Sequence, residues 1–98
     1  MFVILTSKPT QFRTELVEGV RPLETYDYLF YGQKKARFVI AELEHDVKVR
    51  VVDEAPPIVV NDVPSKFLEK FETLEDAREE LNHLTTFGHM DTALERVM

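Results

Sequence analysis

The three histidines are the first residues to test for chemistry, because imidazole serves both as a metal ligand and as a proton carrier. They are His45, His83 and His89, and His89 is followed at a one-residue spacing by Asp91, a pattern found in some metal sites. A metal site typically needs three or four ligands, so this pair alone is a weak signal. A histidine near the end of a helix is also favoured by the helix dipole. We therefore predict no metal site.

Sequence signatures of covalent catalysis and of nucleotide binding are missing from the chain. There is no cysteine, which removes thiol nucleophiles, disulfides and thiolate metal sites. Ser7 and Ser65 lie near prolines and not in a G-x-S-x-G elbow, and the three glycines are isolated from one another. The acidic residues at 75, 76, 79 and 80 face away from the apolar side of a predicted helix, where surface pairing with Arg78 accounts for them. We predict a cofactor-free protein without a catalytic constellation.

An aromatic segment followed by a basic turn is the best candidate for a binding surface. The candidate partner- or ligand-binding residues are Tyr26, Tyr28, Tyr31, Lys34, Lys35 and Arg37. Tyrosine and arginine are enriched at interfaces, because each combines a large contact area with polar atoms. Burial of the aromatic rings in the core is the competing explanation, and the two faces of one strand can serve both purposes.

The distribution of charge argues against nucleic acid as the partner. The net charge is −6; residues 1–37 carry six Lys/Arg against four Asp/Glu, whereas residues 38–98 carry six against fourteen. Binding to phosphate backbones requires clustered cations. Such a site would need the basic residues Lys8, Arg13, Lys34, Lys35 and Arg37 to share one surface. We expect a protein partner or a second copy of the chain instead.

The element that must position these residues is a helix predicted over residues 73–88. Thr73 is a favourable N-cap residue, and Glu75 and Asp76 place negative charge in the first turn. Gly88 supplies the left-handed conformation that ends many helices. The apolar stripe predicted to face the core consists of Leu74, Ala77, Leu81 and Leu84.

The remainder of the chain predicts strands. β-Branched and aromatic residues indicate strands over residues 2–6, 24–31, 36–43 and 47–53, while residues 10–18 fit either a returning strand or a short helix. Three prolines predict a loop over residues 55–66, in which residues 58–60 can join a sheet edge, and residues 89–98 read as a flexible tail with room for one helical turn. The fold class is therefore α+β: a single domain, 1–98, with an antiparallel four- or five-stranded meander and one long C-terminal amphipathic helix packed on one face.

These expectations define two functional hypotheses. The N-terminal apolar run has only four residues and no segment approaches the ~20 apolar residues of a membrane span, so we expect a cytoplasmic protein without membrane contact. The leading hypothesis is a non-catalytic, acidic accessory subunit or protein-interaction module, working with a protein partner or as a homodimer. The alternative is a small dimeric α+β enzyme or ligand-binding protein with a Tyr/Arg/His pocket between sheet and helix. A pocket of about 300 Å³ or more that holds a Tyr or His with a shifted pKa would favour the alternative.

Overall fold

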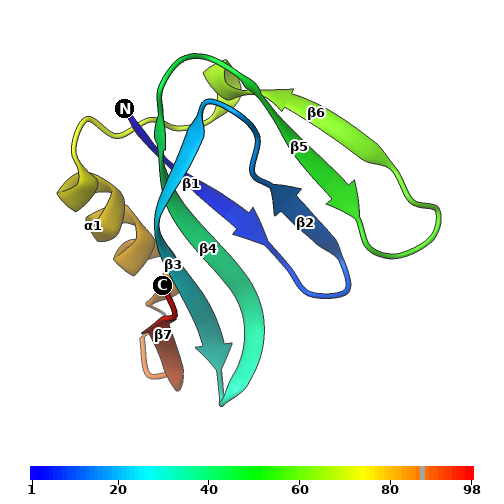
Figure 1. Cartoon of the computed structure of the whole chain (residues 1–98). Coiled ribbons are helices and arrows are strands. Elements are labelled where there is room, and N and C mark those ends of the chain that lie inside the picture. The colour runs from blue at the N-terminus through cyan, green and yellow to red at the C-terminus, as the bar shows by residue number, and fades with distance from the viewer. Residues whose placement is uncertain (87) are drawn as a thin grey trace.

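The chain folds into two antiparallel sheets and one α-helix, seen in a computed structural model that describes residues 1–86 and 88–98 (Figure 1). The elements in chain order are β1 (Phe2–Ser7), β2 (Phe12–Glu15), β3 (Val20–Phe30), β4 (Gln33–Leu43), β5 (Lys48–Asp53), β6 (Val60–Pro64), a 3-10 turn (Ser65–Phe67), α1 (Leu74–Thr85) and β7 (Thr92–Arg96). The strand order is β1-β4-β3-β7 in the larger sheet and β2-β5-β6 in the smaller. The predicted α+β class is confirmed.

Strand alternation gives the larger sheet two apolar faces. On β1, Val3 belongs to one core cluster, while the next residue, Ile4, packs against the other. On β4, Ile40 packs with α1, while Ala41 packs with Val49 of β5. Successive side chains of a strand point to opposite faces, so runs of apolar residues such as those of β1 and β4 serve both layers.

Helix α1 begins as the sequence predicts and buries one face. The Thr73 hydroxyl accepts a hydrogen bond from the Asp76 N–H at 3.0 Å, which caps the first turn. Ala77 and Leu81 are buried against Ile40. The fourth residue of the predicted stripe, Leu84, is an exception, because 49% of its surface is exposed.

The helix is shorter than predicted at its C-terminal end. It ends at Thr85, and Thr86 has an extended backbone. The Thr85 and Thr86 hydroxyls donate to the carbonyls of Leu81 and Asn82 at 2.9 Å and 2.8 Å, and such bonds satisfy acceptors of the last turn. Gly88 has the positive φ of +55° expected of it, but it lies beyond the helix. Position 87 of the predicted helix falls outside the described residues.

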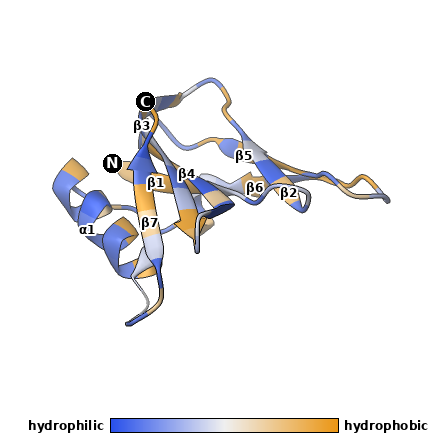
Figure 2. Ribbon diagram, turned by 90° about the horizontal axis from the view of Figure 1, so that it is seen from below, coloured by the Kyte–Doolittle hydropathy of each residue, from blue (hydrophilic) through white to orange (hydrophobic). Residues whose placement is uncertain are grey.

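The strands do not form the single meander predicted from the sequence. β3 occupies one edge of β4, and β1 occupies the other, with Phe2 opposite Glu42 and Leu5 opposite Val39. No edge of β4 remains for β5, which pairs instead with β2 and β6. The smaller sheet extends from the β1 side of the larger one, away from α1, as Figures 1 and 2 show.

The structure also tests the predictions for three further segments. It decides between the two alternatives for one segment and differs from the prediction for the other two. Residues 10–18 contain β2, so the strand alternative is confirmed there. The predicted loop over residues 55–66 contains β6 and the 3-10 turn. The predicted tail over residues 89–98 forms β7 on the edge of β3 instead of a helical turn, because the backbone of β3 offers free hydrogen-bonding groups there.

No helix in the described part of the chain has the length and apolar character needed to cross a membrane.

Candidate functional site

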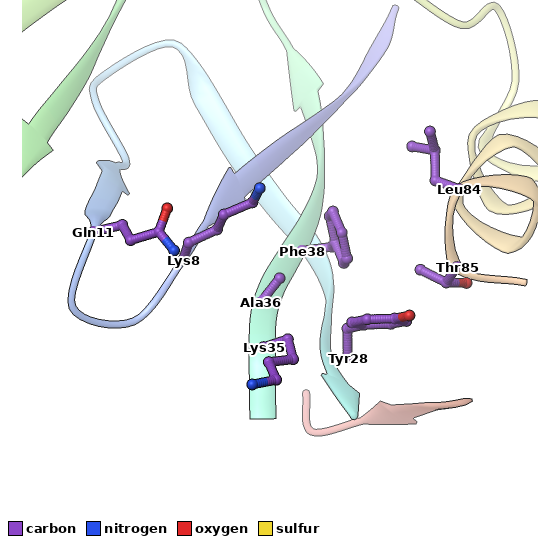
Figure 3. A pocket seen from close by; sticks show the side chains of 8 residues that line it. All are labelled: Lys8, Gln11, Tyr28, Lys35, Ala36, Phe38, Leu84 and Thr85. Atoms are coloured by element: carbon purple, nitrogen blue, oxygen red, sulfur yellow. The ribbon is translucent and has the colours of Figure 1, made fainter. Parts of the chain in front are cut away.

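A cleft beside the last turn of α1 brings together residues from four elements. It has a volume of about 350 Å³ and is lined by Lys8, Gln11, Tyr28, Lys35, Ala36, Phe38, Leu84 and Thr85. Figure 3 shows the side chains of β3 and β4 as its floor, Leu84 and Thr85 of α1 on one side, and Lys8 and Gln11 of the β1–β2 turn on the other.

The floor of this cleft is apolar and well packed. The rings of Tyr28 and Phe38 meet edge to face, with centroids 6.4 Å apart and an interplanar angle of 75°. Tyr28 is 8% exposed, so it contributes one edge of its ring rather than a protruding side chain. Thr85 is buried and its hydroxyl donates to the Leu81 carbonyl. The floor therefore provides contact area more than free hydrogen-bonding groups.

Leu84 also lines a second cleft, so the two clefts adjoin at this side chain. The second cleft, about 130 Å³, is lined by Ile4, Thr6, Leu68, Glu69, Phe71, Glu80 and Leu84. We call the two together the α1 groove: it follows the side of α1 that faces β1. Exposed apolar surface of this kind marks an interaction site when it is continuous and rimmed by polar residues.

The two ends of the α1 groove carry opposite charge. Lys8 and Lys35 are exposed at the end near the β3–β4 turn, and neither has an ion-pair partner among residues 1–86 and 88–98. Glu69 and Glu80 line the other end. An occupant with an acidic group at the first end and a basic group at the second would complement this pattern.

The structure divides the six predicted binding residues among several places. Tyr28 and Lys35 line the α1 groove, while Tyr26 faces α1 at another cleft. Tyr31 is 59% exposed in the β3–β4 turn, where it has a positive φ of 50°. Lys34 and Arg37 lie on a different cleft, of about 310 Å³, together with Arg13. The six residues are therefore not one surface.

Lys34 and Arg37 are both held by the carboxylate of Asp27. It bonds the Arg37 guanidinium at 2.8 Å and lies 3.4 Å from the Lys34 ammonium. The hydrogen bond from Arg37 lowers the pKa of the Asp27 carboxyl, and the same contact raises the pKa of Arg37. The five basic residues that a nucleic-acid site would require are split between two clefts, and two of them are paired with this carboxylate.

A buried carboxylate at Glu24 forms the most connected polar group of the fold. Glu24 lies on β3, is 3% exposed, and receives the Tyr26 hydroxyl at 2.6 Å and the Arg78 Nε at 3.0 Å. A second nitrogen of Arg78 also bonds it, and Arg96 of β7 lies 3.6 Å away. We call these four residues the Glu24 cluster. Arg78 thus pairs with β3, and not on the helix surface as predicted.

The contacts of the Glu24 cluster account for its pKa values. The hydrogen bonds from Arg78 lower the pKa of Glu24 from 4.5 to about 2, against the opposing effect of burial. Burial and the bond to Glu24 raise the pKa of Tyr26, and the same carboxylate raises the pKa of Arg78.

These shifts describe a structural ion pair more than a catalytic group. Tyr26 lines a cleft of about 360 Å³, so a pocket with a shifted tyrosine pKa does exist, as the enzyme hypothesis requires. However, the raised pKa keeps the Tyr26 hydroxyl protonated at neutral pH, and its proton is already donated to Glu24. A general base needs a pKa near the working pH, which Glu24 lacks as well.

Residues with metal-ligating side chains do not gather in the described part of the chain: no group of three or more His, Cys, Asp and Glu could hold an ion there. His45 packs instead beside Gly19, and its Nδ1 lies 3.1 Å from the Asp46 carbonyl.

Sequence reasoning missed Lys8, Gln11, Leu84 and Thr85 as groove residues and Glu24 as a buried anion. Leu84 followed the core spacing, so nothing local distinguished it from Leu81. Glu24 and Arg78 are 54 positions apart, and no spacing rule connects them. Lys34 and Lys35 were both identified. The register shifts between Tyr28, which lies opposite Ala36, and Leu29, which lies opposite Lys34, so Lys35 is an extra residue on β4 and the two lysines reach different clefts.

The chain was compared with models of protein families, with curated proteins and with solved structures, and none of the three comparisons found a match.

Proposed function

We propose that this chain is a non-catalytic, cofactor-free protein-interaction module, of the kind that serves as an accessory subunit, and that it binds an extended segment of a partner protein in the α1 groove. The observation that carries the proposal is Leu84, a half-exposed leucine that lines both clefts of the groove. A leucine with this helical spacing is normally covered by the core. Here a partner side chain would complete its burial.

The charges of the groove support a partner segment of one orientation. Lys8 and Lys35 favour an acidic residue at the end near Tyr28, and Glu69 and Glu80 favour a basic residue at the other end. Apolar side chains between these two would contact Phe38, Leu84 and Leu68. Two adjoining clefts suit a chain segment better than a compact molecule, because a segment can place a side chain in each cleft.

Selection from a displayed library of random peptides tests the proposal directly. We expect selected peptides to share an apolar centre with an acidic residue on one side and a basic residue on the other, in whichever chain direction the peptide binds. Leu84→Asp should weaken their binding about tenfold or more, because it places a charge at the centre of the contact. Leu16→Asp is the matched control, since Leu16 is also 49% exposed but does not line the groove.

Reversing the charge of the two lysines tests which end of the groove binds the acidic residue of the peptide. With Lys8 and Lys35 both changed to Glu, selected peptides should exchange the acidic residue for a basic one. Peptides that bind wild type, Leu84→Asp and Leu16→Asp equally would contradict the proposal.

A small-ligand-binding function of the same cleft is the second candidate. Its volume of about 350 Å³ lies within the usual range for small-molecule sites, and the two lysines fit a carboxylate. Octanoate and phenylacetate are suitable probes, followed by chemical-shift changes around Tyr28 and by thermal stabilisation. Binding of these probes with no peptide selected would favour the second candidate over the first.

A further inference from the structure

β6 forms one of the two edges of the smaller sheet. β6 is the last strand in the order β2-β5-β6, and Figure 1 shows it at the margin of the molecule. Two hydrogen bonds at the ends of the β5–β6 pair show which residues bond across it. The Asp53 N–H donates to the Val59 carbonyl at 2.9 Å, and the Ser65 N–H donates to the Val47 carbonyl at 2.7 Å. Odd-numbered residues therefore point their backbone groups toward β5.

Even-numbered residues of β6 point their backbone groups outward by the same alternation. Val60 lies opposite Val52 and Asp62 opposite Arg50, which are the non-hydrogen-bonded positions of this ladder. Pro64 occupies another such position, where its missing N–H costs nothing. In the described part of the chain no strand pairs with the outer side of β6, so the N–H and C=O groups of Val60 and Asp62 point to an open edge.

This edge carries only part of the protection that is usual for an edge strand. Pro64 closes one end of β6, and Asp62 lies 3.5 Å from Arg50 of the neighbouring strand. The other end is apolar, because Ile58, Val59 and Val60 are 57%, 43% and 54% exposed. Natural sheets guard edges with lysine, proline, bulges or short strands, and residues 58–63 contain neither lysine nor proline. This part of the edge is therefore open to pairing.

The side chains on one face of this segment match themselves across a two-fold axis. In an antiparallel pair of identical strands related by such an axis, residues whose numbers add to a constant lie opposite each other. Centring the axis on Asn61 places Val59 opposite Val63 of the second copy and Asn61 opposite its own copy, while on the other face Val60 lies opposite Asp62. Valine pairs are favourable across strands, and an amide both donates and accepts, so Asn61 can pair with itself. Pro57 and Pro64 limit the paired segment to the residues between them.

We propose that β6 pairs with β6 of a second copy of this chain, which joins the two three-stranded sheets into one six-stranded sheet across a two-fold axis at Asn61. The surface lies on the smaller sheet and shares no residue with the α1 groove, so dimerisation leaves the groove open in both copies. The contact is a single strand pair, and we expect a dimer that depends on protein concentration.

Disulfide trapping tests the register, because the chain has no cysteine of its own. The variant Asn61→Cys carries one thiol at a position where the two copies should face each other in a non-hydrogen-bonded pair, within reach of a disulfide. Val97→Cys is the matched control, because Val97 is also exposed but lies near the C-terminus. We expect oxidation to convert Asn61→Cys to a covalent dimer about tenfold faster than Val97→Cys. Equal rates would overturn the proposal.

Backbone substitution tests the edge itself. Val60→Pro removes an N–H that the monomer does not use, so it should lower the dimer fraction measured by light scattering while the circular dichroism spectrum is kept. Val60→Lys, a side-chain change with the same expected effect, serves if the proline variant does not fold. Wild type that stays monomeric at about 1 mM would overturn the proposal. Dimers unaffected by both variants would overturn it as well.

Discussion

Replacing Arg78 by alanine tests whether the Glu24 cluster ties α1 to β3. The substitution removes the hydrogen bonds that hold the Glu24 carboxylate, which is 3% exposed. Loss of one partner of a buried pair costs about 3–5 kcal/mol, but the Arg78 side chain is 45% exposed, which weakens the pair. Tyr26 and Arg96 remain to bond Glu24. We therefore expect a loss in the free energy of unfolding that is larger than the loss from breaking an exposed ion pair, because Glu24 itself stays buried.

The assay is thermal or urea denaturation at pH 7, with Arg50→Ala as the control. Arg50 pairs with Asp62 at 3.5 Å and both side chains are about half exposed, so its loss should cost about 0–1 kcal/mol. The Arg78 variant should therefore melt well below the Arg50 variant, because only the Arg78 substitution leaves a buried carboxylate short of a partner. Equal melting temperatures for the two variants would refute the reasoning that a buried carboxylate depends on Arg78.

The Glu24 cluster also predicts how the free energy of unfolding falls at acid pH. The pKa of Glu24 is lowered from 4.5 to about 2 in the folded chain, so its contribution is complete above pH 4.5 and is lost as pH falls toward 2. The contribution is about 3 kcal/mol at most, since each pKa unit corresponds to about 1.4 kcal/mol. Glu24→Gln should flatten the stability curve of the wild type over this window. A variant whose stability still falls as steeply as that of wild type would show that other carboxylates set the acid limb.

Two further predictions concern packing and are measured by the same denaturation experiments. Gly19→Ala should cost about 2–4 kcal/mol, because Gly19 has a φ of +91° and a Cβ there would lie 2.7 Å from the His45 ring. Gly32→Ala, at a φ of +76° with open space around it, should cost only about 1 kcal/mol. Leu81→Ala should cost about 2–5 kcal/mol, whereas Leu84→Ala should cost less than about 1 kcal/mol, because only Leu81 is fully buried. Equal costs within either pair would contradict the packing that separates them.

The helix and most strands were predictable from local sequence pattern. Which strands pair with one another was not. Thr73 caps α1 as predicted because capping involves only residues within one turn. The pairing of β1 with β4 joins positions about 35 residues apart, and alternation determines which face a residue takes but not which strand lies beside it. The meander was therefore wrong at the one step that local pattern does not decide.

The C-terminal strand shows how tertiary contacts override local preference. Ala93, Leu94 and Val97 have the spacing of one helical turn, which is why such a turn was expected over residues 89–98. In the fold they lie against β3, where Tyr28 opposes Leu94 and the Thr25 carbonyl accepts from the Val97 N–H at 2.8 Å. The edge of β3 would otherwise leave these backbone groups unpaired.

The Glu24 cluster joins α1 to two strands of the larger sheet. Arg78 bonds Glu24 on β3, and Arg96 of β7 lies 3.6 Å from the same carboxylate. Leu84 lies about two turns further along the helix, where it lines both clefts of the α1 groove with 49% of its surface exposed. Leu81, one turn before Leu84, is buried against Ile40. Both leucines follow the spacing of the apolar stripe, so only tertiary contacts distinguish the leucine that enters the core from the one that is available to a partner.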